Sequence, residues 1–144
     1  MGGEFGPPVV VPALIDCLHR STSTEALLYG DQQAIEKQLA DCENASVLSR
    51  LTVIHCSEII TDSDKPSVAV RSKREASMGR AVKAVADQNA DACISAGNTG
   101  ALMALGLFNL KTLPGISRPA ICTTFPTVRG RTYVLDLGAN IECS

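Results

Sequence analysis

The chain has 144 residues, which is the size of one ordinary domain. Its hydrophobic fraction of 45% and charged fraction of 19% are typical of a globular protein, while aromatic residues at 3% argue against stacking platforms for nucleic acid. The net charge is −2, but residues 1–64 carry ten acidic and three basic side chains whereas residues 65–144 carry five and ten, so an anion site is expected in the second half.

The sequence contains no segment typical of a membrane span or a secretory signal. Its longest apolar runs are far shorter than the ~18 residues that a spanning helix needs. The N-terminus also lacks the basic segment and the apolar segment of a signal peptide. A cytoplasmic location is therefore expected.

The cysteines do not have the spacing of a metal site. They stand at positions 17, 42, 56, 93, 122 and 143, with no pair separated by two residues, and the chain has two histidines. Structural zinc sites need close cysteine pairs or an adjacent histidine cluster. We therefore expect buried free thiols and no metal.

The first half of the chain alternates between helical and strand patterns. A glycine turn at residues 1–6 leads into two prolines and an apolar helical stripe that ends near Arg20. A short buried strand over 26–30 follows, and Asp31 can cap a helix that extends to Leu39. Residues 51–56 then predict a second strand. His55 ends it and is interpreted as a structural histidine rather than a base.

The second half begins with a polar loop over 61–66, which contains two aspartates and a lysine. Residues 67–88 predict a helix that is broken or bent near 72–76. Residues 91–94 predict a strand that leads into a glycine turn. A helix over 99–110 follows, and its apolar residues surround nearly the whole helix, so we expect it to be buried in a thick core or by another chain.

Two further strands are expected near the end of the chain. They cover residues 120–124 and 133–136, with a turn at 129–131 between them and a last glycine loop after them. Strands that alternate with helices indicate an α/β domain with a largely parallel sheet, whose sites lie at the carboxyl ends of the strands. All three glycine loops are expected at that edge.

The glycine turn at 95–101, with the sequence SAGNTGA, is the strongest candidate for a site. Gly97 and Gly100 permit close backbone approach, and Thr99 can cap the following helix. Such a turn directs unpaired amides and the positive end of a helix dipole at one point, which suits a phosphate or an oxyanion. The spacing alone is equally compatible with a tight turn that binds nothing, because it is neither phosphate-loop pattern.

Four stretches in order resemble the PlsX family of bacterial phosphate acyltransferases. They are MGGEFGP at residues 1–7, SAGNTGALM at 95–103, GISRPA at 115–120 and VLDLGAN at 134–140. The resemblance covers essentially the whole chain. It implies a three-layer α/β/α fold with a largely parallel sheet, similar to phosphotransacetylase and to isocitrate and isopropylmalate dehydrogenases.

The resemblance also implies an activity, partners and site positions. The activity is transfer of a fatty acyl group from acyl carrier protein to orthophosphate, giving acyl phosphate for phospholipid synthesis, with no metal or nucleotide cofactor. The implied assembly is a homodimer in the cytoplasm, with peripheral membrane association and no nucleic acid. The positions that would line the substrate and phosphate site are Gly2, Gly3, Ser95, Gly97, Asn98, Thr99, Gly100, Asp136, Gly138 and Asn140.

A phosphate site also needs a cation, because one helix terminus contributes roughly 0.3–1 kcal/mol and millimolar affinity requires about 4 kcal/mol. The candidates for phosphate or carrier-protein contacts are Arg71, Lys73, Arg74, Arg129 and Arg131. The sequence does not rank them, and no residue is assigned as catalytic.

The chain departs from the family pattern in ways that bear on activity. Glu4 stands where the family usually has Asp, the run from Arg74 to Met78 is looser than usual, and the chain has less than half the usual family length. The domain is therefore expected to be incomplete, and residues 1–144 alone are expected to be marginally stable and inactive. The alternatives are a non-catalytic fragment or anion-binding module of the same family, and a nucleotide-binding α/β protein, which the incomplete phosphate-loop patterns disfavour.

Overall fold

The computed structural model of the chain describes residues 3–135. These residues belong to two compact units, one within Met1–Lys111 and the other within Thr112–Ser144. Four of the predicted site positions lie outside the described residues, namely Gly2, Asp136, Gly138 and Asn140.

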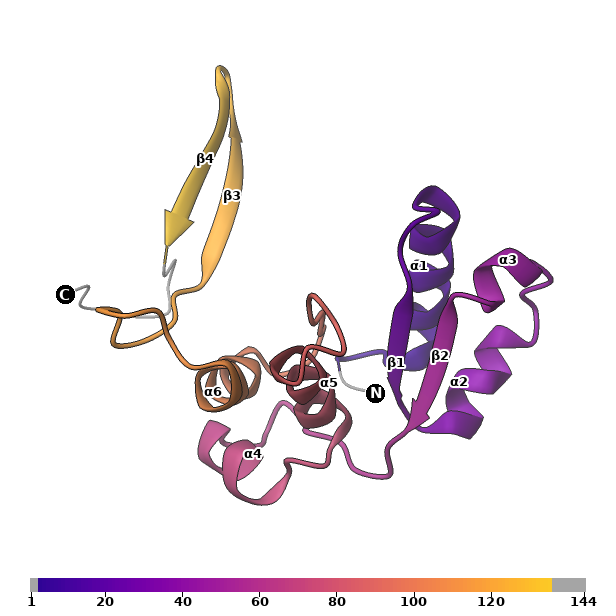
Figure 1. Cartoon of the computed structure of the whole chain (residues 1–144), viewed down its shortest axis with the longest axis horizontal. Coiled ribbons are helices and arrows are strands. Elements are labelled where there is room, and N and C mark those ends of the chain that lie inside the picture. Colours follow the sequence, from indigo (N-terminus) through magenta and orange to yellow (C-terminus); the bar gives the residue numbers. More distant parts are fainter. Residues whose placement is uncertain (1–2, 136–144) are drawn as a thin grey trace. The chain divides into compact units, whose positions relative to one another are not determined.

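The first unit opens with helices around a two-stranded parallel sheet (Figure 1). Its elements are α1 (Pro7–Arg20), β1 (Ala26–Gly30), α2 (Gln32–Leu39), α3 (Ala45–Leu48) and β2 (Leu51–His55). The strands pair in register from Ala26 opposite Leu51 to Gly30 opposite His55. The predicted helices and strands of this region are confirmed, and the four-residue α3 is an addition that the apolar pattern did not predict.

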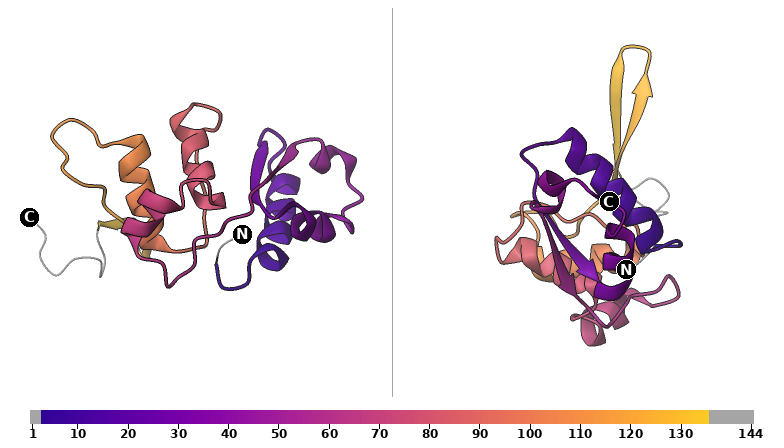
Figure 2. Two further views of the ribbon diagram at one scale, coloured as in Figure 1. Left: turned by 90° about the horizontal axis from the view of Figure 1, so that it is seen from below. Right: turned by 90° about the vertical axis from the view of Figure 1, so that its right-hand side faces the viewer.

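Local sequence explains where these elements begin and what they bury. Pro7 and Pro8 form the first turn of α1, where a missing amide hydrogen is tolerated. Asp31 caps α2 as predicted, its Oδ1 accepting from the Ala34 amide at 2.8 Å. The helices bury one apolar side each, and Figure 2 shows α1 and α2 beside the sheet. The fully buried side chains of α1, α2 and α3 are Val11, Leu18, Ile35 and Val47.

Three helices form the rest of the first unit, with a second hydrophobic core between them. They are α4 (Pro66–Ser72), α5 (Ser77–Ala86) and α6 (Thr99–Leu110). The expected break between residues 72 and 76 is confirmed as the gap between α4 and α5. Helix α6 packs against both α4 and α5, and α5 also contacts β1. The buried side chains of this core are Ile60, Ala69, Ala76, Met78, Val82, Ala101 and Leu105.

The strand predicted over residues 91–94 is not formed. The segment has no regular secondary structure, and the Ile94 side chain is 96% exposed. A strand exists only where its backbone groups pair with a neighbour, and among the described residues β1 and β2 pair only with each other. The apolar character of the segment therefore did not suffice to make it a strand.

Within the described part of this chain α6 is covered on one side, so the expected thick core is not present around it, and cover by another chain stays a prediction. Ala101 and Leu105 are buried, but Leu107, Phe108 and Leu110 are 40%, 41% and 49% exposed. The helix has two neighbours on one side, α4 and α5, so only that side is covered. The exposed residues lie in its last turn.

The second unit contains a β-hairpin. Strand β3 (Cys122–Thr127) pairs antiparallel with β4 (Gly130–Leu135), and two residues connect them. Gly130 has a φ of +141°, which side chains rarely adopt and which glycine permits. Both predicted strands are present, but they pair with each other, so the parallel part of the described fold is β1 and β2.

The described cysteines are free thiols, as expected, but most of them are not buried. Cys56 is buried, Cys42 and Cys93 are half-buried, and Cys17 and Cys122 are exposed. Among the described residues, no helix combines the length and the apolar character needed to cross a membrane.

Candidate anion site at the start of helix α6

Two glycine segments, more than 90 residues apart in the sequence, meet at one place. Gly3 has a φ of +79°, and a Cβ atom added to it would lie 2.8 Å from the Ala96 carbonyl oxygen. A Cβ atom on Gly97 would lie 3.4 Å from the Gly3 nitrogen and 3.0 Å from the Met78 Cε. Position 3 therefore needs glycine, because a Cβ there would collide with the Ala96 backbone at a positive φ, whereas a Cβ on Gly97 would mainly meet the flexible end of the Met78 side chain. The two glycine segments therefore lie together, but not at the expected sheet edge, because residues 91–94 are not a strand.

The turn ends in the N-terminus of α6, and the cap is Asn98 rather than Thr99. The Asn98 Oδ1 accepts from the Ala101 amide at 2.9 Å, and its backbone oxygen accepts from the Leu102 amide at 3.0 Å. Thr99 is instead the first residue of the helix and is exposed. Asn ranks somewhat above Thr as an N-cap residue, and the Asn98 amide group is also held by the 61–64 loop.

Two amides of the first turn of α6 have no recorded hydrogen-bond partner. The N–H groups of Thr99 and Gly100 have no hydrogen-bond partner among the residues that the structure describes. The first turn of a helix directs such amides and the dipole outward together. Ser95 supports the turn from the other side, since its Oγ accepts from the Gly97 amide at 3.2 Å. A Cβ atom on Gly100 would lie 3.1 Å from the Pro66 Cγ, so this position is also closely packed.

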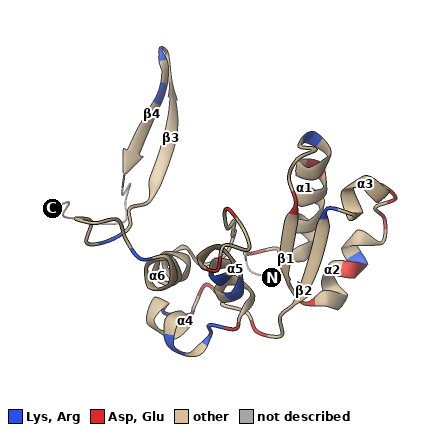
Figure 3. Cartoon of the chain, in the orientation of Figure 1, with Lys and Arg blue, Asp and Glu red and all other residues tan. Residues whose placement is uncertain are grey.

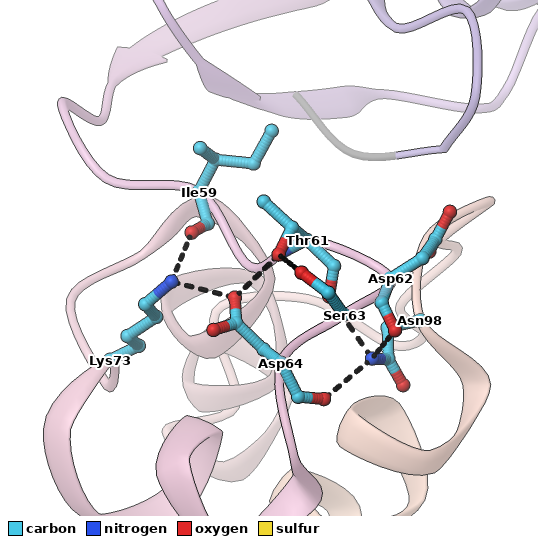
Figure 4. A network of polar contacts seen from close by, with 7 residues as sticks. All are labelled: Ile59, Thr61, Asp62, Ser63, Asp64, Lys73 and Asn98. Atoms are coloured by element: carbon cyan, nitrogen blue, oxygen red, sulfur yellow. Dashed lines mark hydrogen bonds and ion pairs between the residues drawn. The ribbon is translucent and has the colours of Figure 1, made fainter.

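The Asn98 side chain also holds the polar loop of residues 61–64 (Figure 4). Its Nδ2 lies 3.1 Å from the Thr61 carbonyl oxygen, 3.3 Å from that of Asp62 and 3.0 Å from that of Asp64. The side chain thus joins the start of α6 to a loop more than 30 residues earlier. Asn98 was expected to line the site, and in the structure its side chain is bonded to the Ala101 amide and to the 61–64 loop.

The loop owes its shape to Asp64. The Asp64 Oδ2 accepts from the Thr61 amide at 2.8 Å and from the Lys73 ammonium at 2.6 Å (Figure 4). The hydrogen bond from Lys73, followed by that from the Thr61 amide, holds the pKa of Asp64 below its ordinary value. Sequence reasoning recognised a polar loop here without its role. The signal was Thr61 three residues before Asp64, the spacing at which a carboxylate reaches back to an amide.

The candidate cations fall into different environments, and none is placed against the amides of Thr99 and Gly100 by a contact that the structure records. Lys73 is paired with Asp64. The Arg74 Nε donates to the Val70 oxygen, and its guanidinium lies 4.4 Å from the centre of the Phe108 ring. Arg71 is exposed at the end of α4. Arg129 and Arg131 belong to the second unit, and Figure 3 shows basic residues at the tip of its hairpin.

A small, mostly apolar cavity of about 100 Å³ adjoins the turn. Tyr29 lies on the wall of this cavity, and burial raises the pKa of its hydroxyl although the nearby Arg80 guanidinium lowers it. Burial also raises the pKa of the Cys93 thiol, which belongs to the segment before the turn. Both groups are therefore neutral near pH 7. The cavity is lined by Val10, Leu27, Leu28, Tyr29, Ser77, Met78, Ala81, Ile94, Ser95 and Ala96.

The histidine that ends β2 has a structural contact. His55 is exposed, and its Nδ1 accepts from the Gln32 amide at 3.3 Å, which agrees with a structural role. Within residues 3–135, no three His, Cys, Asp or Glu side chains gather in a way that could hold a metal ion.

Comparison with known proteins identifies similar chains along the whole sequence. The model of a family described as "Fatty acid synthesis protein" matches residues 1–144. A protein named phosphate acyltransferase from Vibrio parahaemolyticus serotype O3:K6 is 51% identical over 144 residues, which are 99% of this chain and 42% of that protein. One of the same name from Methylococcus capsulatus is 49% identical over 144 residues, 100% of this chain and 42% of the relative. The chain therefore spans less than half the length of these relatives.

Proposed function

Because this chain belongs to the fatty acid synthesis protein family, we propose that it supplies part of the active site of a phosphate acyltransferase. The reaction moves a fatty acyl group from acyl carrier protein to orthophosphate and gives an acyl phosphate for phospholipid synthesis. Relatives at about 50% identity that carry the name phosphate acyltransferase support this proposal.

The observation that carries the proposal is the meeting of the two glycine segments at the start of α6. A side chain on Gly3 would collide with the Ala96 backbone, and Gly97 packs against Gly3 and Met78. Beside them, the amides of Thr99 and Gly100 have no partner among the described residues. An arrangement of small residues and unpaired amides at a helix N-terminus suits an anion that must approach the backbone.

The chemistry requires few side chains. A phosphate oxygen attacks the thioester carbonyl carbon, the carbon–sulfur bond breaks, and the carrier leaves as a thiolate that takes a proton from water. Phosphate is already a nucleophile near neutral pH, so the protein's task is to hold it and to stabilise the oxyanion that forms. We assign the amides of Thr99 and Gly100 to one of these two anions. Gly2, Gly3, Ser95 and Gly97 would line the same site, together with Asp136, Gly138 and Asn140.

Basic residues would contribute both to phosphate binding and to the attraction of the carrier protein. A helix terminus stabilises an anion by at most about 2 kcal/mol, so a cation must supply part of the binding free energy of phosphate. Exposed arginines would also attract an acidic carrier protein, and the candidates for this are Arg71 and Arg74 in the first unit and Arg129 and Arg131 in the second. We further propose a cytoplasmic homodimer that associates peripherally with the membrane.

The test is an assay of the complete gene product with acyl carrier protein thioester and orthophosphate. Acyl phosphate and free carrier thiol should form in equal amounts, and only when phosphate is present. Thioester loss that does not depend on phosphate contradicts the proposal. Phosphate binding without any thioester loss would instead identify an anion-binding module of the same family.

A further inference from the structure

We propose that Asn98 and Asp64 are positioning residues, which hold the start of α6 in the orientation that binds the anion without contacting the anion themselves. This inference rests on the proposed function. It concerns how the anion site is built, and it assigns a purpose to the 61–64 loop.

The first step concerns the hydrogen-bonding capacity of Asn98. A carboxamide has two N–H donors and one carbonyl acceptor. The acceptor is used by the Ala101 amide at 2.9 Å. The two donors face three backbone oxygens between 3.0 and 3.3 Å away, all from residues 61–64. No donor of this side chain remains for a phosphate, so Asn98 acts through the helix that it caps.

The second step concerns the loop that receives these donors. A loop of four residues keeps three carbonyl oxygens pointing at one nitrogen only if its backbone is held. The Asp64 carboxylate does this, since its Oδ2 accepts from the Thr61 amide at 2.8 Å and the Thr61 hydroxyl at 3.0 Å. The Asp64 amide in turn donates to the Thr61 oxygen at 3.1 Å, which closes the loop in both directions.

The third step concerns Lys73, which was a candidate for binding phosphate. Its ammonium contacts the Asp64 Oδ2 at 2.6 Å and the Ile59 oxygen at 3.2 Å. The Asp64 side chain is only 17% exposed, so its charge is best matched by this partner. Lys73 therefore belongs to the support of the loop, and Figure 4 shows the continuous path from Lys73 through Asp64 to Asn98.

The consequence concerns the amides of Thr99 and Gly100. They follow Asn98 directly, so a change in its position turns both of them. A misplacement of about 1 Å can cost about 100-fold in rate. Loss of either positioning residue should therefore raise the KM for phosphate, while the KM for the acyl donor changes little.

A double-mutant cycle in the complete gene product tests this. Asn98→Ala and Asp64→Ala should each lower kcat/KM for phosphate by about 10- to 100-fold. Because both act along one path, the double variant should be no more than about 3-fold worse than the worse single variant. Fully multiplicative losses would overturn the inference, since they would mean that Asn98 acts independently of the loop.

The chain offers a matched control. Lys83 and Asp87 in and after α5 form an ion pair with the same Nζ–Oδ2 distance of 2.6 Å, and neither touches the turn. Asp87→Ala should leave both KM values within about 2-fold of the wild type. An Asp64→Ala variant that behaves like Asp87→Ala would also overturn the inference.

Two measures keep the test decisive. If Asp64→Ala does not fold, Asp64→Asn replaces it in the cycle, because the amide oxygen still accepts from Thr61 while the pairing with Lys73 is lost. The cycle is also measured as the dissociation constant of inorganic phosphate by calorimetry, where coupled losses support the inference and independent losses contradict it. Absence of turnover in the wild type would count against the proposed function, whereas an additive cycle counts against the positioning role.

Discussion

The two ends of α6 differ sharply although the sequence of the helix is apolar throughout. At its start, Asn98 is tied to the 61–64 loop, and Ala101 is fully buried. At its end, Leu107, Phe108 and Leu110 are all at least 40% exposed. Its glycines differ in the same way, because a Cβ on Gly100 would meet Pro66 whereas one on Gly106 would have no atom within 4 Å. Hydrophobicity along a helix therefore does not reveal which of its turns is constrained.

The largest effect is expected from Gly100→Val, which should abolish turnover of the complete gene product. The new side chain would press on the Pro66 Cγ, only 3.1 Å from the position of its Cβ, and would cover the amides of the first turn. Turnover is measured as phosphate-dependent release of carrier thiol.

The control on the same helix is Gly106→Ala, which should keep full activity. It should raise the free energy of unfolding by about 0.5–1 kcal/mol, because it replaces a glycine in the helix interior and its new methyl group has no atom within 4 Å to collide with. Gln38→Ala in α2 should be silent in the same assay. A folded and active Gly100 variant would refute the anion-site assignment.

The next largest effect is a difference in the free energy of unfolding between variants of two leucines on opposite sides of α6. Leu105→Ala should lower the free energy of unfolding by about 2–5 kcal/mol, because this side chain is 1% exposed in the core with α4 and α5. Leu107→Ala should cost less than about 1 kcal/mol, since it is already 40% exposed. Denaturant unfolding of the two variants gives the difference. Equal losses would mean that the exposed side is covered in the complete protein.

A smaller loss of stability is expected when the N-cap residue of α6, Asn98, is exchanged than when a core leucine is removed, and the N-cap residue of α2, Asp31, provides the comparison. Asn98→Asp keeps the acceptor for Ala101 but points a carboxylate at three carbonyl oxygens, so it should cost about 1–3 kcal/mol. Asp31→Asn in α2 should change stability by less than about 0.5 kcal/mol, because that cap only accepts a hydrogen bond. Thermal unfolding compares the two swaps, and similar midpoints would show that the Asn98 amide group contributes nothing.

The smallest effect is a pH dependence at Asp64. Its pKa lies below the ordinary value of about 3.9 because Lys73 and the Thr61 amide stabilise the carboxylate. The group binds a proton more readily when unfolded, so its stabilisation is complete above about pH 4 and is lost as the pH falls through the lowered pKa. The difference in melting temperature between wild type and Asp64→Asn should be constant from pH 8 to 5 and shrink toward pH 3. A difference that grew in acid would have the wrong sign.

The sequence predicted where the candidate site lies, but it did not predict the contacts of the side chains around it. The paired glycine segments at residues 3 and 97 were expected to meet, and they do. Asn98 was expected to line the site and Lys73 was one of five unranked candidates for phosphate or carrier-protein contacts, and both side chains contact the 61–64 loop. These contacts join residues 9 to 37 positions apart, a range over which no local pattern specifies a partner.

The sequence by itself determined the elements that local rules govern. Apolar periodicity, the prolines at the start of α1, the Asp31 cap and the break between α4 and α5 each depend on residues within a turn or two of one another. Only the tertiary structure decided that residues 91–94 are not a strand, that β3 and β4 pair antiparallel, and that Asn98 caps α6. The physical reason is that strand pairing and the choice between neighbouring cap residues depend on hydrogen-bond partners distant in the sequence.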